Sequence, residues 1–231
     1  MTETYLNTLT GSKRPIANKA IVILPIIALS GYAVLQLFPL TRWRSVRIVQ
    51  ENGPVELLTF AALLFGGLIT LGRSWTWYKN ENISIPSVLL ALLGIGFIFI
   101  SMEEISWGQQ FLKFETPDTF QSINIQGETT LHNIEGMHGH ASFLYLIFAI
   151  GGLCSYTLYR TDFGIASLDR LSPPPSLISF FAVVGIFGLV KLHTEFASVS
   201  AVYMSGVRWT SEVAEMLISV AAILYAVSLK E

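Results

Sequence analysis

The chain has 231 residues, of which 52% are hydrophobic and only 13% are charged, and its mean hydropathy is +0.57. A soluble domain of this size carries about 25% charged residues. The formal net charge of −2 provides no field that would attract nucleic acid. The composition therefore excludes a disordered chain, a nucleic-acid-binding protein and an ordinary secreted domain. It indicates a protein that crosses a lipid bilayer several times.

Six apolar stretches each approach the roughly 20 residues that a helix needs to cross about 30 Å of hydrocarbon. A transmembrane β-barrel would show alternating segments of about ten residues instead of these continuous runs. The sequence therefore predicts an all-α bundle of six transmembrane helices that forms one membrane domain over residues 1–231. The predicted spans are 20–38, 54–72, 86–112, 142–159, 177–197 and 212–229, with a long polar loop over 113–137.

The charges divide unequally between the two faces of this predicted bundle. The face that carries both termini holds eight of the 14 Lys and Arg residues but only five of the 16 acids. The opposite face holds the other six basic residues, eleven acids and all four His. The small excess of Lys and Arg predicts that both termini are cytoplasmic. The acidic, His-containing face is then extracytoplasmic, and we expect the functional site there.

Glu103 and Glu104 lie near the end of the third predicted span. Counted from Pro86 at about 1.5 Å per residue, Glu104 lies roughly 27 Å along the helix, just inside the far edge of the hydrocarbon. A carboxylate at this depth indicates a site that faces the bundle interior. Because adjacent helical residues point about 100° apart, only one of the two can face a ligand directly. A stripe of small and polar residues favours Glu104. In the alternative interpretation, both carboxylates pair with basic residues of neighbouring helices.

The His residues predict a metal site at the same face. His132, Glu135 and His138 form an HxxExxH pattern, which would share one face if the segment were helical. Imidazole and carboxylate are common ligands of zinc, iron and manganese. We therefore expect Glu104, His132, His138 and His193 to bind a divalent metal. Gly136 within the pattern and Gly139 directly after it weaken the predicted helix. In the alternative, these His residues are solvated and bind nothing.

Three further acids at this face have a structural explanation. Glu56 follows a predicted cap at Gly53, and Glu212 and Glu215 lie at the predicted start of the sixth span. Acids in the first turn of a helix are stabilised by the positive end of its dipole.

Two polar loops complete the predicted site. The connection over 113–137 is too long for a simple link, and we expect it to re-enter the bundle or to cover it as a lid. Arg42 and Arg44 follow the first span and bring positive charge to an acidic face. They would bind an anionic substrate or head group, or they would neutralise the carboxylates. Gln109 and Glu128 complete the predicted substrate-binding set.

Three sequence strings resemble an uncharacterised family of bacterial multi-spanning membrane proteins. They are ENGPVE at 51–56, EEISWGQ at 103–109 and QGETTLHN at 126–133. This resemblance implies a multi-pass protein of the bacterial inner membrane, and it implies no particular activity.

A Glu-Glu pair followed by separated His residues is also similar to the glutamate-type intramembrane proteases of the CAAX-protease group. In that group a Glu and two His activate water. The resemblance would assign these roles to Glu103, Glu104, His138 and His193. The chain departs from the group's pattern at Ala197, where the group has Asn or Asp.

These observations lead to three functional hypotheses. The first is a membrane-embedded, metal-assisted hydrolase that acts on a lipid or a membrane peptide, with Glu103 and Glu104 as catalytic residues. The second is a non-enzymatic accessory or assembly subunit of a larger membrane complex, for which aromatic residues near the span ends would provide docking surfaces. The third is an ion or small-solute transporter, which the absence of an internal repeat disfavours.

Overall fold

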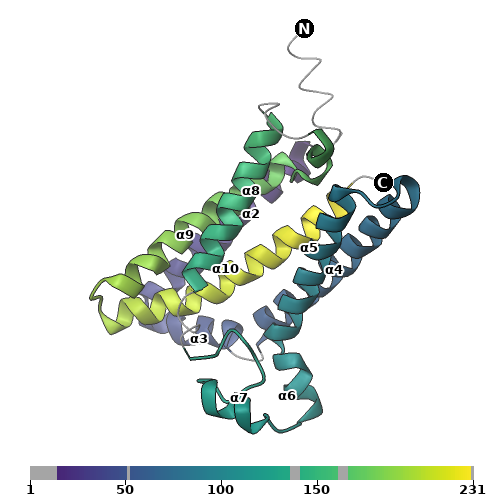
Figure 1. Ribbon diagram of the computed structural model, residues 1–231. Helices are drawn as coiled ribbons and strands as arrows, with labels where there is room; N and C mark the ends of the chain where they lie inside the picture. The colour runs from purple at the N-terminus through teal and green to yellow at the C-terminus, as the bar shows by residue number, and fades with distance from the viewer. Residues whose placement is uncertain (1–14, 51–52, 136–140, 161–165, 230–231) are drawn as a thin grey trace.

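The computed structural model describes residues 15–50, 53–135, 141–160 and 166–229, and this part of the chain is all-α (Figure 1). The predicted all-α class is confirmed for these residues. The longer helices are α2 (Pro15–Leu37), α3 (Pro39–Val49), α4 (Pro54–Glu81), α5 (Ile85–Glu104), α8 (Ala141–Arg160), α9 (Ile178–Phe196) and α10 (Ala201–Ser228). Two short helices follow α5, namely α6 (Gln109–Leu112) and α7 (Asp118–Ile123).

Five helical stretches in the described residues are long and apolar enough to cross a membrane. They are Lys19–Leu37, Pro39–Glu81 (which contains α3 and α4), Ile85–Glu104, Pro175–Phe196 and Ala201–Ser228. A shorter apolar helix, Ser142–Leu158, lies within α8 at the position of the predicted fourth span. The helix composition thus supports a protein that crosses the bilayer several times.

Two helix boundaries differ from the predicted spans in ways that affect the site. α5 ends at Glu104 instead of continuing to residue 112, because Ser106 and Trp107 adopt left-handed backbone angles, with φ of 48° and 56°. α10 begins at Ala201 instead of residue 212, and the side chain of Ser200 caps it by accepting a hydrogen bond from the Tyr203 amide. After an apolar first turn, Ser205, Arg208, Thr210 and Ser211 interrupt the apolar residues, and this hid the start from a hydropathy pattern.

The early start of α10 overturns one explanation given above. Glu212 and Glu215 lie well inside the helix, so its N-terminal dipole does not account for them. For Glu56 the predicted arrangement is confirmed, because α4 has Gly53 at its N-cap and Pro54 at its first position.

α4 and α5 pack closely because glycines line their crossing. A Cβ atom on Gly67 would lie 2.9 Å from the carbonyl oxygen of Gly94, and a Cβ on Gly94 would lie 3.0 Å from that of Gly67. Further along, the hydroxyl of Ser74 donates to the carbonyl of Ser87 at 2.7 Å. These contacts fix the register of the antiparallel pair. They bring the start of α4 level with the end of α5.

α10 runs between the α4–α5 pair and the α8–α9 pair (Figure 1). On one side, Gly66 of α4 approaches the backbone of Ile223 of α10, because a Cβ there would lie 3.2 Å from the Ile223 nitrogen. On the other side, an apolar core that includes Phe180, Val184 and Leu217 joins α9 to α10. α10 therefore carries side chains to both halves of the bundle.

Candidate functional site: a loop anchored by Glu103 and a carboxylate cluster around Glu104

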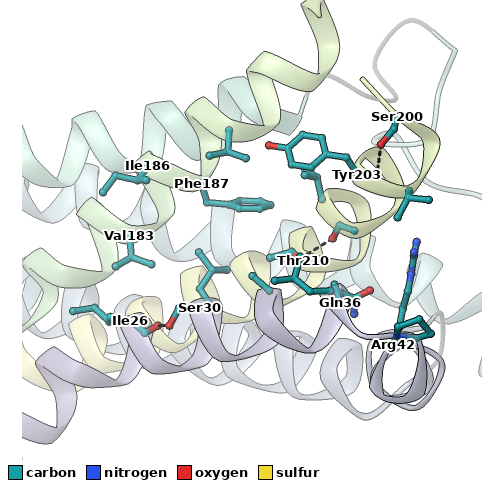
Figure 2. A pocket seen from close by; sticks show the side chains of 18 residues that line it. Ile26, Ser30, Gln36, Arg42, Val183, Ile186, Phe187, Ser200, Tyr203 and Thr210 are labelled. Carbon is teal, nitrogen blue, oxygen red and sulfur yellow. Dashed lines mark hydrogen bonds between the residues drawn. The ribbon is translucent and has the colours of Figure 1, made fainter. Parts of the chain in front are cut away.

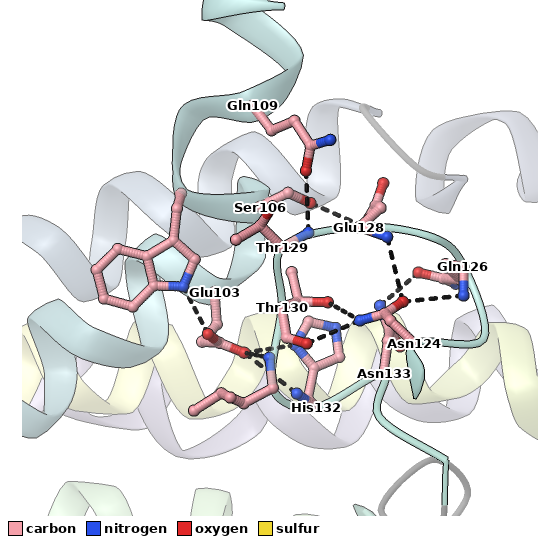
Figure 3. A network of polar contacts seen from close by, with 12 residues as sticks. Glu103, Ser106, Gln109, Asn124, Gln126, Glu128, Thr129, Thr130, His132 and Asn133 are labelled. Atoms are coloured by element: carbon pink, nitrogen blue, oxygen red, sulfur yellow. Dashed lines mark hydrogen bonds and ion pairs between the residues drawn. The ribbon is translucent and has the colours of Figure 1, made fainter. Parts of the chain in front are cut away.

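Glu103 anchors the loop that follows α5 (Figure 3). Its side chain is buried, with 6% relative exposure. Its Oε1 accepts a hydrogen bond from Trp107 Nε1 at 2.6 Å, and its Oε2 accepts from the amides of Leu131 at 2.7 Å and His132 at 3.2 Å. The Nδ1 of His132 also lies 3.2 Å from Oε2. These contacts occupy the acceptor positions of the carboxylate, and they tie the far end of the loop to α5.

Gln109 and Glu128, which were predicted to bind substrate, hold the same loop together. The Oε1 of Gln109 accepts from the Thr129 amide at 2.9 Å, while its Nε2 donates to Thr116 Oγ1 at 2.6 Å. Glu128 Oε2 accepts a hydrogen bond from the Ser106 hydroxyl at 2.7 Å. In this structure both side chains therefore support the loop, and substrate binding by them remains a prediction.

Asn124 is an organising residue that the sequence analysis missed. It is buried, and its Oδ1 accepts from the amides of Gln126 at 3.0 Å and Glu128 at 3.2 Å (Figure 3). Its Nδ2 donates to the carbonyl of Thr130 at 2.8 Å. An Asn side chain that bonds the backbone two residues ahead is an Asx turn, so an Asn early in this polar segment was the available signal. The loop is thus compact and internally bonded.

The predicted metal ligands are not brought together in the described residues. His132 and Glu135 lie in a turn instead of a helix, and the His132 side chain is 52% exposed beside Glu103. His193 is exposed in the last turn of α9. His138 lies outside the described residues. Over the ranges given above, no three His, Cys, Asp or Glu side chains form a possible metal site. The four-ligand set therefore stays a prediction.

Glu104 faces a different environment from its neighbour. It is partly buried and interacts electrostatically with the carboxyl groups of Glu215 and Glu212 on α10 and of Glu56 on α4. The α4–α5 register brings Glu56 level with Glu104, and the long α10 adds its two acids at the same level. We call these four residues the carboxylate cluster. Three helices build it, and two of its members lie in a helix interior.

Polar and basic side chains from α8, α9 and α10 surround the carboxylate cluster. The hydroxyl of Tyr145 donates to Glu215 Oε1 at 2.5 Å. The Nζ of Lys191 donates to Ser211 Oγ at 3.0 Å and lies 5.5 Å from the centre of the Tyr145 ring. Lys191 and Arg208 also attract Glu212 electrostatically. The cluster is therefore partly compensated by positive charge from the neighbouring α9 and from α10 itself.

A cavity of about 800 Å³ lies between α2, α9 and α10 (Figure 2). Its wall is mostly apolar and includes Phe187, whose ring centre lies 5.7 Å from that of Tyr145. Of the two predicted anion-binding residues, Arg42 lines the cavity, whereas Arg44 stacks on Trp43 at 5.4 Å. Both lie on α3 instead of in a loop.

The fold and the site define an all-α protein with several long apolar helices and a group of acidic residues at one level of the bundle. No protein-family model, curated protein or solved structure matches the chain. The family resemblances described above therefore rest on their sequence strings alone.

Proposed function

We propose that the chain is a membrane-embedded hydrolase that acts on a lipid or a membrane peptide from the extracytoplasmic leaflet. The observation that carries this proposal is the convergence of Glu104 with Glu56, Glu212 and Glu215 from three apolar helices. Carboxylates within membrane helices are costly, and they are a recurrent sign of a functional site. The apolar cavity beside Tyr145 favours a lipid as the substrate.

Hydrolysis by such a cluster needs two carboxyl groups with different roles. Glu104 accepts a proton from water as the water oxygen bonds to the electrophilic atom of the substrate ester. A second, protonated carboxyl group then donates a proton to the departing alcohol as the ester bond breaks. This proton would come from another member of the carboxylate cluster, in which Tyr145 donates a hydrogen bond to Glu215 Oε1 at 2.5 Å. Glu103 acts as a positioning residue that keeps the loop closed.

A divalent metal is a separate part of the proposal. Zinc, iron or manganese would be bound by Glu104 and His138, with His132 or His193 as further ligands. Such an ion would lower the pKa of a bound water and stabilise the developing negative charge. The donor types fit these metals.

The hydrolase proposal includes a membrane topology. α8 would supply a sixth span, both termini would be cytoplasmic, and the protein would lie in a bacterial inner membrane. The unequal distribution of Lys and Arg supports this orientation, and the resemblance of the strings at 51–56, 103–109 and 126–133 supports the bacterial origin.

The hydrolase proposal is tested with the purified full chain in lipid vesicles. Mass spectrometry of the lipids should show products with the wild type, and Glu104→Gln should reduce their rate at least about 100-fold, as expected for loss of a general base. Glu115→Gln, at an exposed position of the loop, is the matched control and should retain activity. Absence of lipid or peptide cleavage by the wild type would contradict the proposal. Metal analysis of wild type and His138→Ala tests the metal part independently.

One observation favours a second candidate, an accessory subunit of a larger membrane complex. Side chains from the strings at 103–109 and 126–133 build an internally hydrogen-bonded loop instead of lining the cavity. A compact polar loop at a membrane surface is suited to docking a partner. This candidate predicts stoichiometric copurification with another membrane protein and full function of Glu104→Gln within that complex.

A further inference from the structure

We propose that the cavity between α2, α9 and α10 binds an anionic phospholipid, with one acyl chain along the cavity and the phosphate against Arg42. The binding site is independent of any reaction. Only the further step, that this lipid is the substrate, rests on the proposed hydrolase function.

The cavity changes from apolar to polar along its length (Figure 2). Ile26, Val183 and Ile186 line one end, whereas Arg42 and Tyr203 lie at the other. Along α2 the lining residues extend from Ile26 to Leu37, which corresponds to roughly 17 Å at 1.5 Å per residue. A long, narrow apolar wall with one polar end matches an acyl chain that carries a polar head group.

The charge at the polar end selects an anionic head group. Arg42 is the one charged residue among the described residues that line the cavity, so the lining contains no carboxylate to repel a phosphate. Arginine binds phosphate through two parallel hydrogen bonds, and this geometry is stronger than a neutral contact. The end of α2 and the start of α10 lie at the same side of the bundle, where lipid head groups would be found.

Gln36 adds a preference for a head group that carries hydroxyls. Its side chain is buried and lines the cavity, and its Nε2 donates to the hydroxyl of Ser45 at 2.8 Å. Its Oε1 has no hydrogen-bond partner within the described residues. A buried acceptor without a partner costs free energy, and a hydroxyl donor from a ligand would satisfy it. Phosphatidylglycerol offers both the phosphate and the hydroxyls.

The same cavity leads towards the carboxylate cluster. Phe187 forms part of its wall and contacts the ring of Tyr145, which in turn donates a hydrogen bond to Glu215. A phospholipid held by Arg42 would therefore have its head group and ester bonds beside α10, the helix that carries Glu212 and Glu215. If the proposed hydrolase function holds, this placement makes an anionic phospholipid its substrate.

Native mass spectrometry of the full chain tests the binding site. The protein is released from nanodiscs that contain equal amounts of phosphatidylglycerol and phosphatidylcholine with identical chains. We expect phosphatidylglycerol to be retained preferentially, and Arg42→Gln to lower this preference about tenfold, the order of one charge-assisted hydrogen bond. Arg47→Gln is the matched control, because Arg47 lies on the same helix but its guanidinium stacks on Trp43, 4.8 Å from the ring centre. Ala33→Trp, which fills the cavity, should reduce the retention of both lipids.

Circular dichroism and gel filtration establish that each variant is folded before its lipids are compared. Equal retention of the two lipids by the wild type, or equal losses of preference in Arg42→Gln and Arg47→Gln, would overturn the binding site. Selective retention of phosphatidylglycerol without lipid cleavage would support the binding site and contradict the hydrolase proposal. Lipid cleavage by a protein that retains both lipids equally would support the hydrolase and overturn the binding site.

Discussion

Glu103 and Glu104 are adjacent in the chain, yet their carboxyl groups lie in two different environments. Glu103 accepts hydrogen bonds from Trp107 and from the backbone of Leu131 and His132, all of them in the segment after α5. Glu104 instead interacts with carboxyl groups on α4 and α10. One residue of the pair thus holds the loop, and the other belongs to the interior of the bundle.

Removal of the Glu103 carboxylate should loosen the loop without unfolding the bundle. In Glu103→Ala we expect the protection of the Leu131 and His132 amides against hydrogen exchange to fall about ten- to a hundredfold. A hydrogen bond to a charged acceptor contributes about 1.5–3 kcal/mol, which accounts for this range. Hydrogen-exchange mass spectrometry measures the change, with Glu115→Ala as the exposed control in the same loop. Unchanged protection would mean that Glu103 does not anchor this segment.

Neutralising Glu104 should stabilise the protein while it removes the proposed activity. Like charges at short range repel, so Glu104→Gln is expected to raise stability by about 1 kcal/mol, or roughly 2–4 °C in the unfolding temperature. Thermal unfolding in detergent provides the measurement, and Glu115→Gln should leave the midpoint unchanged. A lower midpoint for Glu104→Gln would indicate that the ionised carboxylate is needed to pair with Lys191 or Arg208.

The α4–α5 crossing should tolerate no added side chain. In Gly67→Ala the new methyl group would meet the Gly94 carbonyl at 2.9 Å, and such overpacking costs about 1–3 kcal/mol. Gly72 lies on the same helix, and a Cβ atom added there would have no neighbouring atom within 4 Å, so Gly72→Ala should be neutral or slightly stabilising. Unfolding midpoints of the two variants separate packing from helix propensity. Equal midpoints would contradict the close crossing.

At the opposite end of the bundle, Arg170 should matter more for stability than its acidic partner. Its guanidinium lies 4.1 Å from the ring centre of the buried Trp77, and its Nη1 contacts Glu81 Oε1 at 2.6 Å. Arg170→Gln loses both interactions and should cost about 1–2 kcal/mol. Glu81→Gln keeps the ring contact and should cost less than about 1 kcal/mol, because the ion pair is exposed. Urea unfolding measures the loss in the free energy of unfolding for each variant. Equal losses in the two variants would mean that the contact between Arg170 and the Trp77 ring contributes nothing.

The proposed topology predicts where a C-terminal reporter resides. A fluorescent protein that folds only in the cytoplasm should be active when fused after Glu231, and alkaline phosphatase at the same position should be inactive. The same two reporters inserted after Lys113 should give the opposite result. Active phosphatase at the C-terminus would invert the orientation and would place the carboxylate cluster at the cytoplasmic face.

Much of the helical architecture could be predicted because hydropathy is a local property. The apolar stretches located the membrane helices, and the cap at Gly53 and Pro54 located the start of α4. The start of α10 was missed because polar residues between Ser205 and Ser211 interrupt its apolar residues, and there only backbone geometry reveals the helix. The HxxExxH spacing suggested a helix, yet His132 lies in a turn, since contacts to Glu103 and Asn124 determine the loop conformation.

By itself the sequence determined that this protein is all-α and that it carries several helices suited to a bilayer. Only the tertiary structure decided which acids meet. The glycine crossing of α4 and α5 and the path of α10 bring Glu56, Glu104, Glu212 and Glu215 together, although they are widely separated in the chain. Helix propensity and hydropathy depend on neighbouring residues, whereas the side of a helix that faces the interior depends on the shape of the helices packed against it.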